Sequence, residues 1–483
     1  MNNISQVELS EKQSIKTSAE ESLNFNLDDI LRFASKDSIR RRNLNDSSLI
    51  DRPTFSLYTK EDINSYLTDP FKYEKDLRKA SVYMYGASTH YKRIIQYFAG
   101  LSDLSYIVSP YKVNTSSAKV SSIKRDYYKV SEVLSSMDIK TQFRKVLSVC
   151  LREDVFYGTM WVSTDNIVIQ QLPSDYCSID TIESGVPNVT FNFAYFSRKE
   201  GLLDYYPSEF KKKYNIYKNN SKLKWQELDS PTSFAVKCNS DILDYSIPPF
   251  VGIFREIYDI EDYKQLKKAK TELENYALLV MKLGLAKDGR WELNFDKAKE
   301  FWMNLDSVLP EEVGSILTPM NLEKIDFNKN GTTDSDRIAE SEEHLWSAAG
   351  VSSTLFNNKK ASADSLLISV KADQAITFNI VKGIEAVINR YIQSLSFGKG
   401  FKVTFLDVSP YNRSEYAEMA SKGMSLGMPL ISTYCAVMGL DQSEMDSICL
   451  LEQDILELPK RFKPLMSSHT QSIDVRSSVD DDE

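Results

Sequence analysis

Three histidines are the first residues to consider as catalysts or metal ligands. His90, His344 and His469 lie far apart and form neither an H-x-x-x-H nor an H-E-x-x-H pattern. The sequence therefore offers few residues for zinc-assisted hydrolysis or for acid/base catalysis by histidine. His344 stands in an acidic segment, where we expect a solvated side chain.

Paired carboxylates offer a second route to chemistry, through a bound divalent metal ion. The candidates are Asp334 with Asp336, and Glu342 with Glu343. Residues one or two positions apart on a helix point to different faces, so neither pair is expected to share an ion. We predict no metal site.

Nucleotide hydrolysis would need a glycine loop that binds phosphate. The pattern G-x-x-x-x-G-K-[ST] is absent, and Phe397–Phe401 (FGKGF) lacks both the leading glycine spacing and the Ser/Thr. We interpret FGKGF as a helix terminus. The sequence thus predicts a protein that is not an enzyme and needs no cofactor.

Two clusters of basic residues could contact phosphate. Lys359 and Lys360 follow Asn357 and Asn358 in a polar run that indicates a loop; the alternative is a pair of lysines exposed only to solvent. Arg40-Arg41-Arg42 could contact nucleic acid or a scaffold protein, but a surface turn is the simpler interpretation.

An acidic helix is predicted from Thr333 to Ala349, immediately before the polar loop. It carries five carboxylates and a single arginine, and its few large apolar residues are Ile338, Leu345 and Trp346, so it has little to bury. Gly350 then ends it as a C-terminal cap would.

A long helix and a strand follow the polar loop. Large apolar residues recur mostly at three- and four-residue steps, which predicts one apolar face on a helix of about nine turns. They are Leu367, Val370, Phe378, Val381, Ile384, Ile388, Ile392 and Leu395. Gly398 and Gly400 close the helix, and Phe401, Val403 and Phe405 alternate with polar residues as in a half-buried strand.

The serial order of these pieces resembles that of the portal proteins of tailed bacteriophages, particularly phages of Gram-positive hosts. The segments that carry the resemblance are AAGVSSTLF, SLLISVKADQAITFNIVKGIEAVINRYI and FKVTFLDVSPYNRSEY, with further likeness in QLPSDYCSID, IPPF, GSILTP and KPLMSSHTQS. It covers roughly residues 50–470. Its specificity lies in the order of the pieces, because no single residue is diagnostic.

The resemblance implies an α+β, ring-forming portal fold with wing, stem, clip and crown regions. The implied regions are a disordered arm (1–26), the wing (27–258), stem helices (259–282 and 333–350), the clip (283–332), a tunnel loop (351–365), the tunnel helix with a returning wing strand (366–411), the crown (412–457) and a C-terminal tail (458–483). In the crown, Met419, Met424, Leu426 and Met428 suggest helices that repack.

The implied function is that of a head-tail connector at one capsid vertex of the virion. A ring, of twelve subunits in that family, would pass duplex DNA during packaging, retain it, and release it on ejection. The implied partners are the terminase large subunit, the major capsid and scaffold proteins, a head-tail adaptor and duplex DNA, with assembly in the host cytoplasm.

The resemblance also implies two contact sites. The tunnel loop would contact DNA through Asn357, Asn358, Lys359 and Lys360, and the clip would dock the terminase or adaptor through Trp291, Trp302, Glu311 and Glu312. Either tryptophan could instead belong to a hydrophobic core.

The charge and composition of the chain limit the classes of function that it can have. With 483 residues, a net charge of −9 and 42% hydrophobic residues, the chain is a folded acidic protein and not one that wraps DNA with a basic surface. An acidic channel wall suits DNA that slides, although any ordinary acidic protein shows the same balance. The five cysteines lack CxxC spacing, which predicts neither a disulfide framework nor a zinc site.

Other patterns in the sequence predict the helices and strands of residues 27–250. Residues 27–151 are patterned as helices, and residues 155–250 predict an antiparallel sheet in which Val189, Phe191, Phe193 and Tyr195 share a strand. A short helix is expected near Pro207–Tyr217. No apolar segment follows Met1, and Lys282 interrupts the most apolar window, so neither secretion nor a membrane span is expected.

A second long helix is expected at Ile260–Met281. Its lysines could pair with the acidic helix, within the chain or between neighbours in a ring. After it, Gly284–Phe327 predicts a compact α/β insert. The insert would comprise strands near Trp291–Leu293 and Val313–Leu317 and a helix near Asp296–Leu309.

Two other classes of function remain open. An enzyme of nucleic-acid metabolism would need a catalytic cluster, which the sequence does not display. Another virion structural protein, such as a head-tail adaptor or a minor capsid protein, would share the acidic and motif-poor composition.

Overall fold

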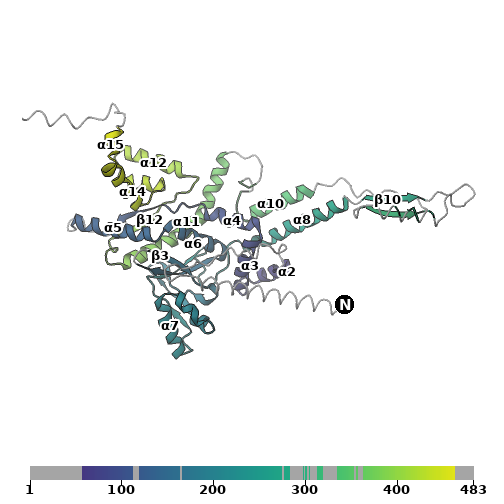
Figure 1. Cartoon of the computed structure of the whole chain (residues 1–483), viewed down its shortest axis with the longest axis horizontal. Coiled ribbons are helices and arrows are strands. Elements are labelled where there is room, and N and C mark those ends of the chain that lie inside the picture. Colours follow the sequence, from purple (N-terminus) through teal and green to yellow (C-terminus); the bar gives the residue numbers. More distant parts are fainter. Residues whose placement is uncertain are drawn as a thin grey trace, which may run out of the picture.

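The computed structural model is a mixed α+β protein, as the sequence predicts (Figure 1). It describes residues 57–111, 119–163, 166–274, 277–282, 313–318, 334–352, 355–356 and 363–462, together with the helical residues 297, 300, 301 and 304. The predicted N-terminal arm, Arg40-Arg41-Arg42 and the strand near Trp291–Leu293 lie outside these ranges.

Helices make up most of the first described part of the chain, as predicted, but the strand at Tyr106–Pro110 lies among them and was not predicted. The helices are α2 (Lys60–Thr68), α3 (Glu74–Ala87), α4 (Thr89–Ala99), α5 (Val120–Ser136) and α6 (Ile139–Glu153). Side chains that accept hydrogen bonds from the first turn cap three of these helices: Thr59 caps α2, Ser88 caps α4 and Asp138 caps α6.

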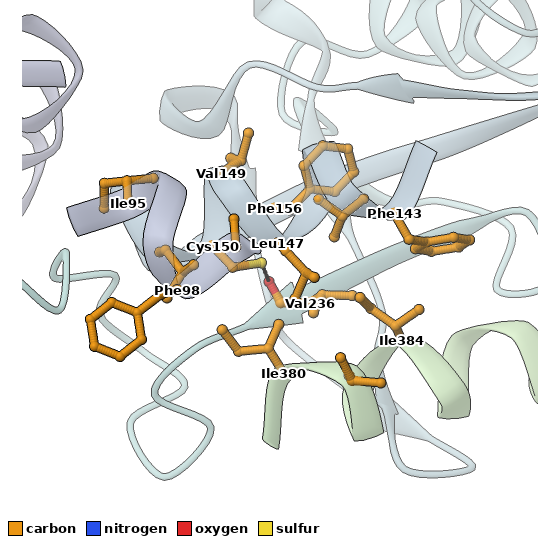
Figure 2. Close-up of a cluster of buried hydrophobic side chains, with 14 of the residues drawn as sticks. Ile95, Phe98, Phe143, Leu147, Val149, Cys150, Phe156, Val236, Ile380 and Ile384 are labelled. Carbon is orange, nitrogen blue, oxygen red and sulfur yellow. Dashed lines mark hydrogen bonds between the residues drawn. The ribbon is translucent and has the colours of Figure 1, made fainter. Parts of the chain in front are cut away.

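The main core lies between these helices, a three-stranded sheet and the long helix α11 (Ala363–Ser394). In the sheet, β2 (Val155–Val162) pairs antiparallel with β3 (Ile167–Gln171) on one side and β9 (Ser233–Lys237) on the other. Figure 2 shows the core where α6, β9 and α11 meet: Ile380 and Ile384 of α11 lie across from Leu147, and the Cys150 thiol donates to the Val236 carbonyl at 3.3 Å.

A pair of strands joins the N-terminal helical region to the segment that follows α11. In it, β1 (Tyr106–Pro110) lies antiparallel to β12 (Phe401–Phe405), in register from Tyr106↔Phe405 to Pro110↔Phe401. The burial of β12 alternates along the strand, which confirms the predicted half-buried strand.

A second core organises residues 172–235 and corrects the prediction of one continuous sheet. Its strands are β4 (Cys177–Ser178), β7 (Thr190–Asn192) and β8 (Trp225–Glu227), with a separate hairpin of β5 (Ile182–Glu183) and β6 (Val186–Pro187). Strand β7 ends at Asn192, whose side chain accepts from the Ala194 amide and starts a 3-10 turn over Phe193–Phe196. The prediction that Val189, Phe191, Phe193 and Tyr195 share a strand was therefore wrong. Phe193 and Tyr195 lie in the 3-10 turn, in which Phe196 is buried and Tyr195 is not.

Two short 3-10 helices and one α-helix complete this second unit. They are Ser174–Tyr176, Glu200–Tyr205 and α7 (Ser208–Asn219). Helix α7 confirms the short helix expected in this region. Figure 1 shows α7 at one extremity of the molecule.

Two helices leave the body side by side (Figure 1). A 3-10 turn, Val251–Ile253, leads into α8 (Phe254–Glu274), and α10 (Asp334–Ala348) returns along it. Beyond the far end of α8, β10 (Ala277–Lys282) pairs in parallel with β11 (Val313–Thr318). The prediction of a helix from Ile260 to Met281 was wrong at both ends, since the apolar run Ala277–Met281 forms a strand that pairs with β11. The strand predicted at Val313–Leu317 is confirmed.

Short helices follow β12. They are α12 (Arg413–Ser425), α13 (Ile431–Val437), α14 (Gln442–Cys449), a π-helical turn at Leu450–Ile455 and α15 (Leu458–Arg461). They lie together on the side of the body opposite α7 (Figure 1). Among the described residues, no helix combines the length and apolar character needed to span a membrane.

Candidate functional site: an aromatic junction between the projecting helices and α11

The two sets of residues predicted to contact partners lie outside the described residues. They are Asn357, Asn358, Lys359 and Lys360 of the polar loop, and Trp291, Trp302, Glu311 and Glu312 of the insert. The described chain ends on either side of the polar loop, at Phe356 and Ala363. A junction between α10, α4 and α11 holds the flanks of that loop.

The C-terminal end of α10 is fixed by a hydrogen-bonded cap. Gly350 adopts a φ of +74°, its amide donates to the Ser347 carbonyl at 3.0 Å, and the Val351 amide donates to the Trp346 carbonyl at 2.9 Å. These are the two hydrogen bonds of a Schellman motif, in which glycine avoids the steric cost of a left-handed residue. The predicted cap at Gly350 is confirmed.

Trp346 and Phe356 form the centre of the junction. Their rings stack with centroids 4.3 Å apart and an interplanar angle of 17°. Trp346 is only 4% exposed. The stack joins the last turn of α10 to the residue that precedes the polar loop, so the chain on both sides of Gly350 is held by one contact.

Three residues on one face of helix α4 pack against this stack. His90 lies beside Trp346 (ring centroids 6.1 Å), the Arg93 guanidinium lies 5.6 Å from the centre of the Phe356 ring, and Tyr97 meets Phe356 edge to face at 5.5 Å. Spacings of three and four residues place these side chains along one side of a helix. We call His90, Arg93, Tyr97, Trp346 and Phe356 the aromatic junction.

A polar ladder continues from the aromatic junction to α11. The Tyr97 hydroxyl donates to Asp373 Oδ2 at 2.8 Å, the Thr377 hydroxyl donates to the Phe98 carbonyl at 2.8 Å, and the Gln374 amide donates to Ser409 Oγ at 2.6 Å. Burial raises the pKa of Asp373, and the hydrogen bond from Tyr97 opposes that rise. Burial also raises the pKa of Tyr97, so its hydroxyl remains a donor.

His90 is the titratable group at the other end of the aromatic junction. Burial lowers its pKa from the ordinary 6.5, Lys264 of α8 lowers it further, and Glu342 of α10, whose carboxylate lies 3.4 Å from Nε2, opposes both. The imidazole is therefore held neutral between two projecting helices. His344, in contrast, is exposed next to Glu340, as the sequence predicts.

The aromatic junction is a set of packing, hydrogen-bond and electrostatic contacts. Among the described residues, no group of three or more His, Cys, Asp or Glu side chains could hold a metal ion. Glu342 faces His90, and all five cysteines are free thiols. The junction holds α10 against α4 and links α4 to α11 through packed rings and a hydrogen bond.

The sequence analysis missed His90, Tyr97 and Asp373 as parts of this site. Their partners lie more than 250 residues away, with Tyr97 and Asp373 separated by 276 positions. The available signal was the seven-residue spacing of His90 and Tyr97 on one predicted helix. That spacing alone does not reveal what covers the face.

No protein-family model matches this sequence, and no curated protein matches it either. Solved structures that are similar to the chain come from gene transfer agent (GTA) particles. The neck of an empty GTA particle computed with C6 symmetry matches with 12% identity and a TM-score of 0.42, over 81% of this chain and 100% of that chain. The virion of a native GTA particle and the native neck computed with C12 symmetry each match with 12% identity and a TM-score of 0.41, over 83% of this chain and 99% of theirs.

Proposed function

We propose that this chain is the subunit of a portal ring, a head-tail connector through which a genome enters and leaves a capsid. The proposal rests first on the sequence resemblance. The observation in the structure that supports it is the helix pair α8 and α10, which leaves the body, carries a pair of strands at its far end and returns into α11 (Figure 1). In this reading α8 and α10 are the stem, β10 and β11 belong to the clip, and α11 is the tunnel helix.

A ring would account for the apolar surface of the C-terminal helices. Several large side chains there are more than half exposed: Met419, Leu426, Met428, Ile431, Met438, Leu450, Ile455 and Phe462. Their own core in this region is small and consists largely of Ala420, Ala436 and Val437. Exposed apolar side chains gathered on neighbouring helices mark interfaces, and neighbouring copies in a closed ring would cover them.

The proposal also gives roles to the polar loop and the clip. The polar loop with Lys359 and Lys360 would line the channel and contact passing DNA. The clip, with Trp291, Trp302, Glu311 and Glu312, would dock the terminase or a head-tail adaptor. The protein would perform no chemical step. The terminase, as the packaging motor, would supply the energy for DNA packaging. Assembly would take place in the host cytoplasm, with the capsid and scaffold proteins.

The mass and shape of the assembled particle test this proposal. Twelve copies of the 55.2 kDa chain give about 660 kDa. We expect mass photometry of the assembled protein to give that value and negative-stain images to show a ring with a central hole. A chain that is present in virions only as a monomer would contradict the proposal.

A further inference from the structure

Residues 198–226, which we call the basic lobe, differ in charge from the rest of the molecule. They hold eight Lys or Arg and three Asp or Glu residues, a net charge of +5 within a chain of net charge −9. The lobe consists of the 3-10 helix Glu200–Tyr205, α7, the turn that follows α7 and part of β8, and α7 lies at one extremity of the molecule (Figure 1). Its charge is thus separated from the acidic body.

The basic lobe is a fixed surface because its inner face is packed. Phe210 and Tyr214 of α7 are buried in the second core. The Gln226 amide donates to the Lys213 carbonyl at 3.0 Å and to the Leu223 carbonyl at 2.9 Å, which holds the turn beside the middle of α7. The Ser197 and Tyr217 hydroxyls, 3.2 Å apart, bring residue 198 to the same helix.

The three acids of the lobe are already used. Lys211 pairs with Asp204 at 2.6 Å, Lys213 with Glu209 at 2.8 Å, and Lys218 with Glu200 at 2.8 Å. In the described chain, no carboxylate lies within ion-pair distance of four other cations of the lobe, all exposed: Arg198, Lys212, Lys222 and Lys224. These four charges are available to a ligand.

We infer that the basic lobe binds the phosphate backbone of duplex DNA without reading its sequence. Lysines act as point charges toward phosphate, and they are depleted where proteins dock on proteins. The exposed apolar side chains of the lobe, Ile216, Leu223 and Trp225, are each 40–46% exposed and are interleaved with lysines, so they form no continuous apolar centre. The acidic body does not cancel this attraction, because charges are screened beyond about 10 Å at ordinary salt.

The contact would lie apart from the channel proposed above and would engage DNA outside it. This inference does not require the ring. Its failure is therefore distinguishable from that of the proposed function, which is judged by particle mass and images.

Fluorescence anisotropy of a labelled duplex of about 30 base pairs tests the inference on the full-length protein. The lobe variant is Lys212→Glu/Lys222→Glu/Lys224→Glu. The matched control is Lys75→Glu/Lys119→Glu/Lys399→Glu, which changes three exposed lysines of the body and alters the net charge equally. Circular dichroism confirms that both variants fold.

We expect the lobe variant to bind at least about tenfold more weakly than the parent at about 50 mM salt, and the control to lose less than about threefold. The slope of log affinity against log salt should fall by about 2.7 in the lobe variant, since each lost phosphate contact removes about 0.9.

Equal losses in the two variants would overturn the inference, because net charge alone would then explain binding. A parent that binds no duplex at low salt would overturn it as well. If that parent result is joined by lobe variants that form rings but do not enter particles, the lobe binds an acidic protein surface and not DNA.

Discussion

Gly350 is the residue at which the acidic helix turns toward α11. Its φ of +74° is costly for any residue with a Cβ, whereas a Cβ there would meet no atom within 4 Å. We therefore expect Gly350→Ala to destabilise the chain by about 1 kcal/mol through backbone conformation alone. Gly201→Ala is the matched control, since Gly201 also has open space and no positive φ. Urea unfolding measures the free energy of unfolding of both variants. Equal losses in the two variants would contradict a role of the positive φ of Gly350 in capping α10.

His90 makes the stability of the chain depend on pH. Burial lowers its pKa below 6.5, so the folded state binds fewer protons than the unfolded state near and below that pH. The stabilising contribution is present above pH 6.5 and is lost as the pH falls through the folded pKa. We expect His90→Gln to flatten the dependence of unfolding free energy on pH between about 7 and 5.

The control for this experiment is His344→Gln, because His344 is exposed on α10, one of the two helices that flank His90. It should leave the pH profile as it is in the parent. A parent profile that His90→Gln does not change would place the pH dependence in other groups.

At the scale of elements, the projecting pair is held to the body at its base. Lys60 of α2 bonds to Asp259 of α8, and the Tyr258 hydroxyl donates to the Tyr58 carbonyl at 2.6 Å. On the other helix, Trp346 joins the aromatic junction. Both helices are therefore anchored near the body, while β10 and β11 pair at the far end.

The polar loop is the element that we expect to touch DNA inside the channel. Two lysines per chain become about two dozen positive charges in a ring of twelve, and salt screens them beyond about 10 Å. Reversing Lys359 and Lys360 together to Glu should leave ring assembly intact and lower the retention of packaged DNA, more at low salt than at high salt.

Nuclease protection of packaged DNA measures this effect. The lobe variant described above serves as a comparison, since it reverses lysine charges outside the polar loop. Rings with both loop lysines reversed that hold full-length DNA as the parent does, at every salt concentration, would show that the loop is only a connector.

At the scale of the whole molecule, the proposal of a passive channel predicts no turnover of ATP. The sequence holds no phosphate-binding glycine loop, so highly purified protein should release phosphate from ATP at the background rate. The measurement is steady-state phosphate release with and without duplex DNA. ATP turnover that a point mutation in this chain abolishes would refute the proposal that the protein is not an enzyme.

The sequence by itself determined the elements whose patterns are local. The apolar stripe of α11, the alternation of Phe401, Val403 and Phe405 and the glycine cap at residue 350 each depend on neighbours within a few positions. The structure confirms the alternation and the cap, and it confirms the stripe from Val370 onward, whereas Leu367 is exposed. The same local reading failed for Ala277–Met281, where an apolar run fits a helix or a strand, and pairing with β11 decides between them.

Only the tertiary structure decided which distant residues meet. Tyr97 and Asp373, or β1 and β12, are brought together by the packing of α11 across the main core. The basic lobe also became visible only in the fold. In the sequence, nothing distinguishes its lysines from other lysines of the chain. The structure shows which of them form ion pairs with carboxylates, and it places α7 at one extremity of the molecule. Pairing and burial depend on contacts between segments far apart in the chain, and no local pattern records them.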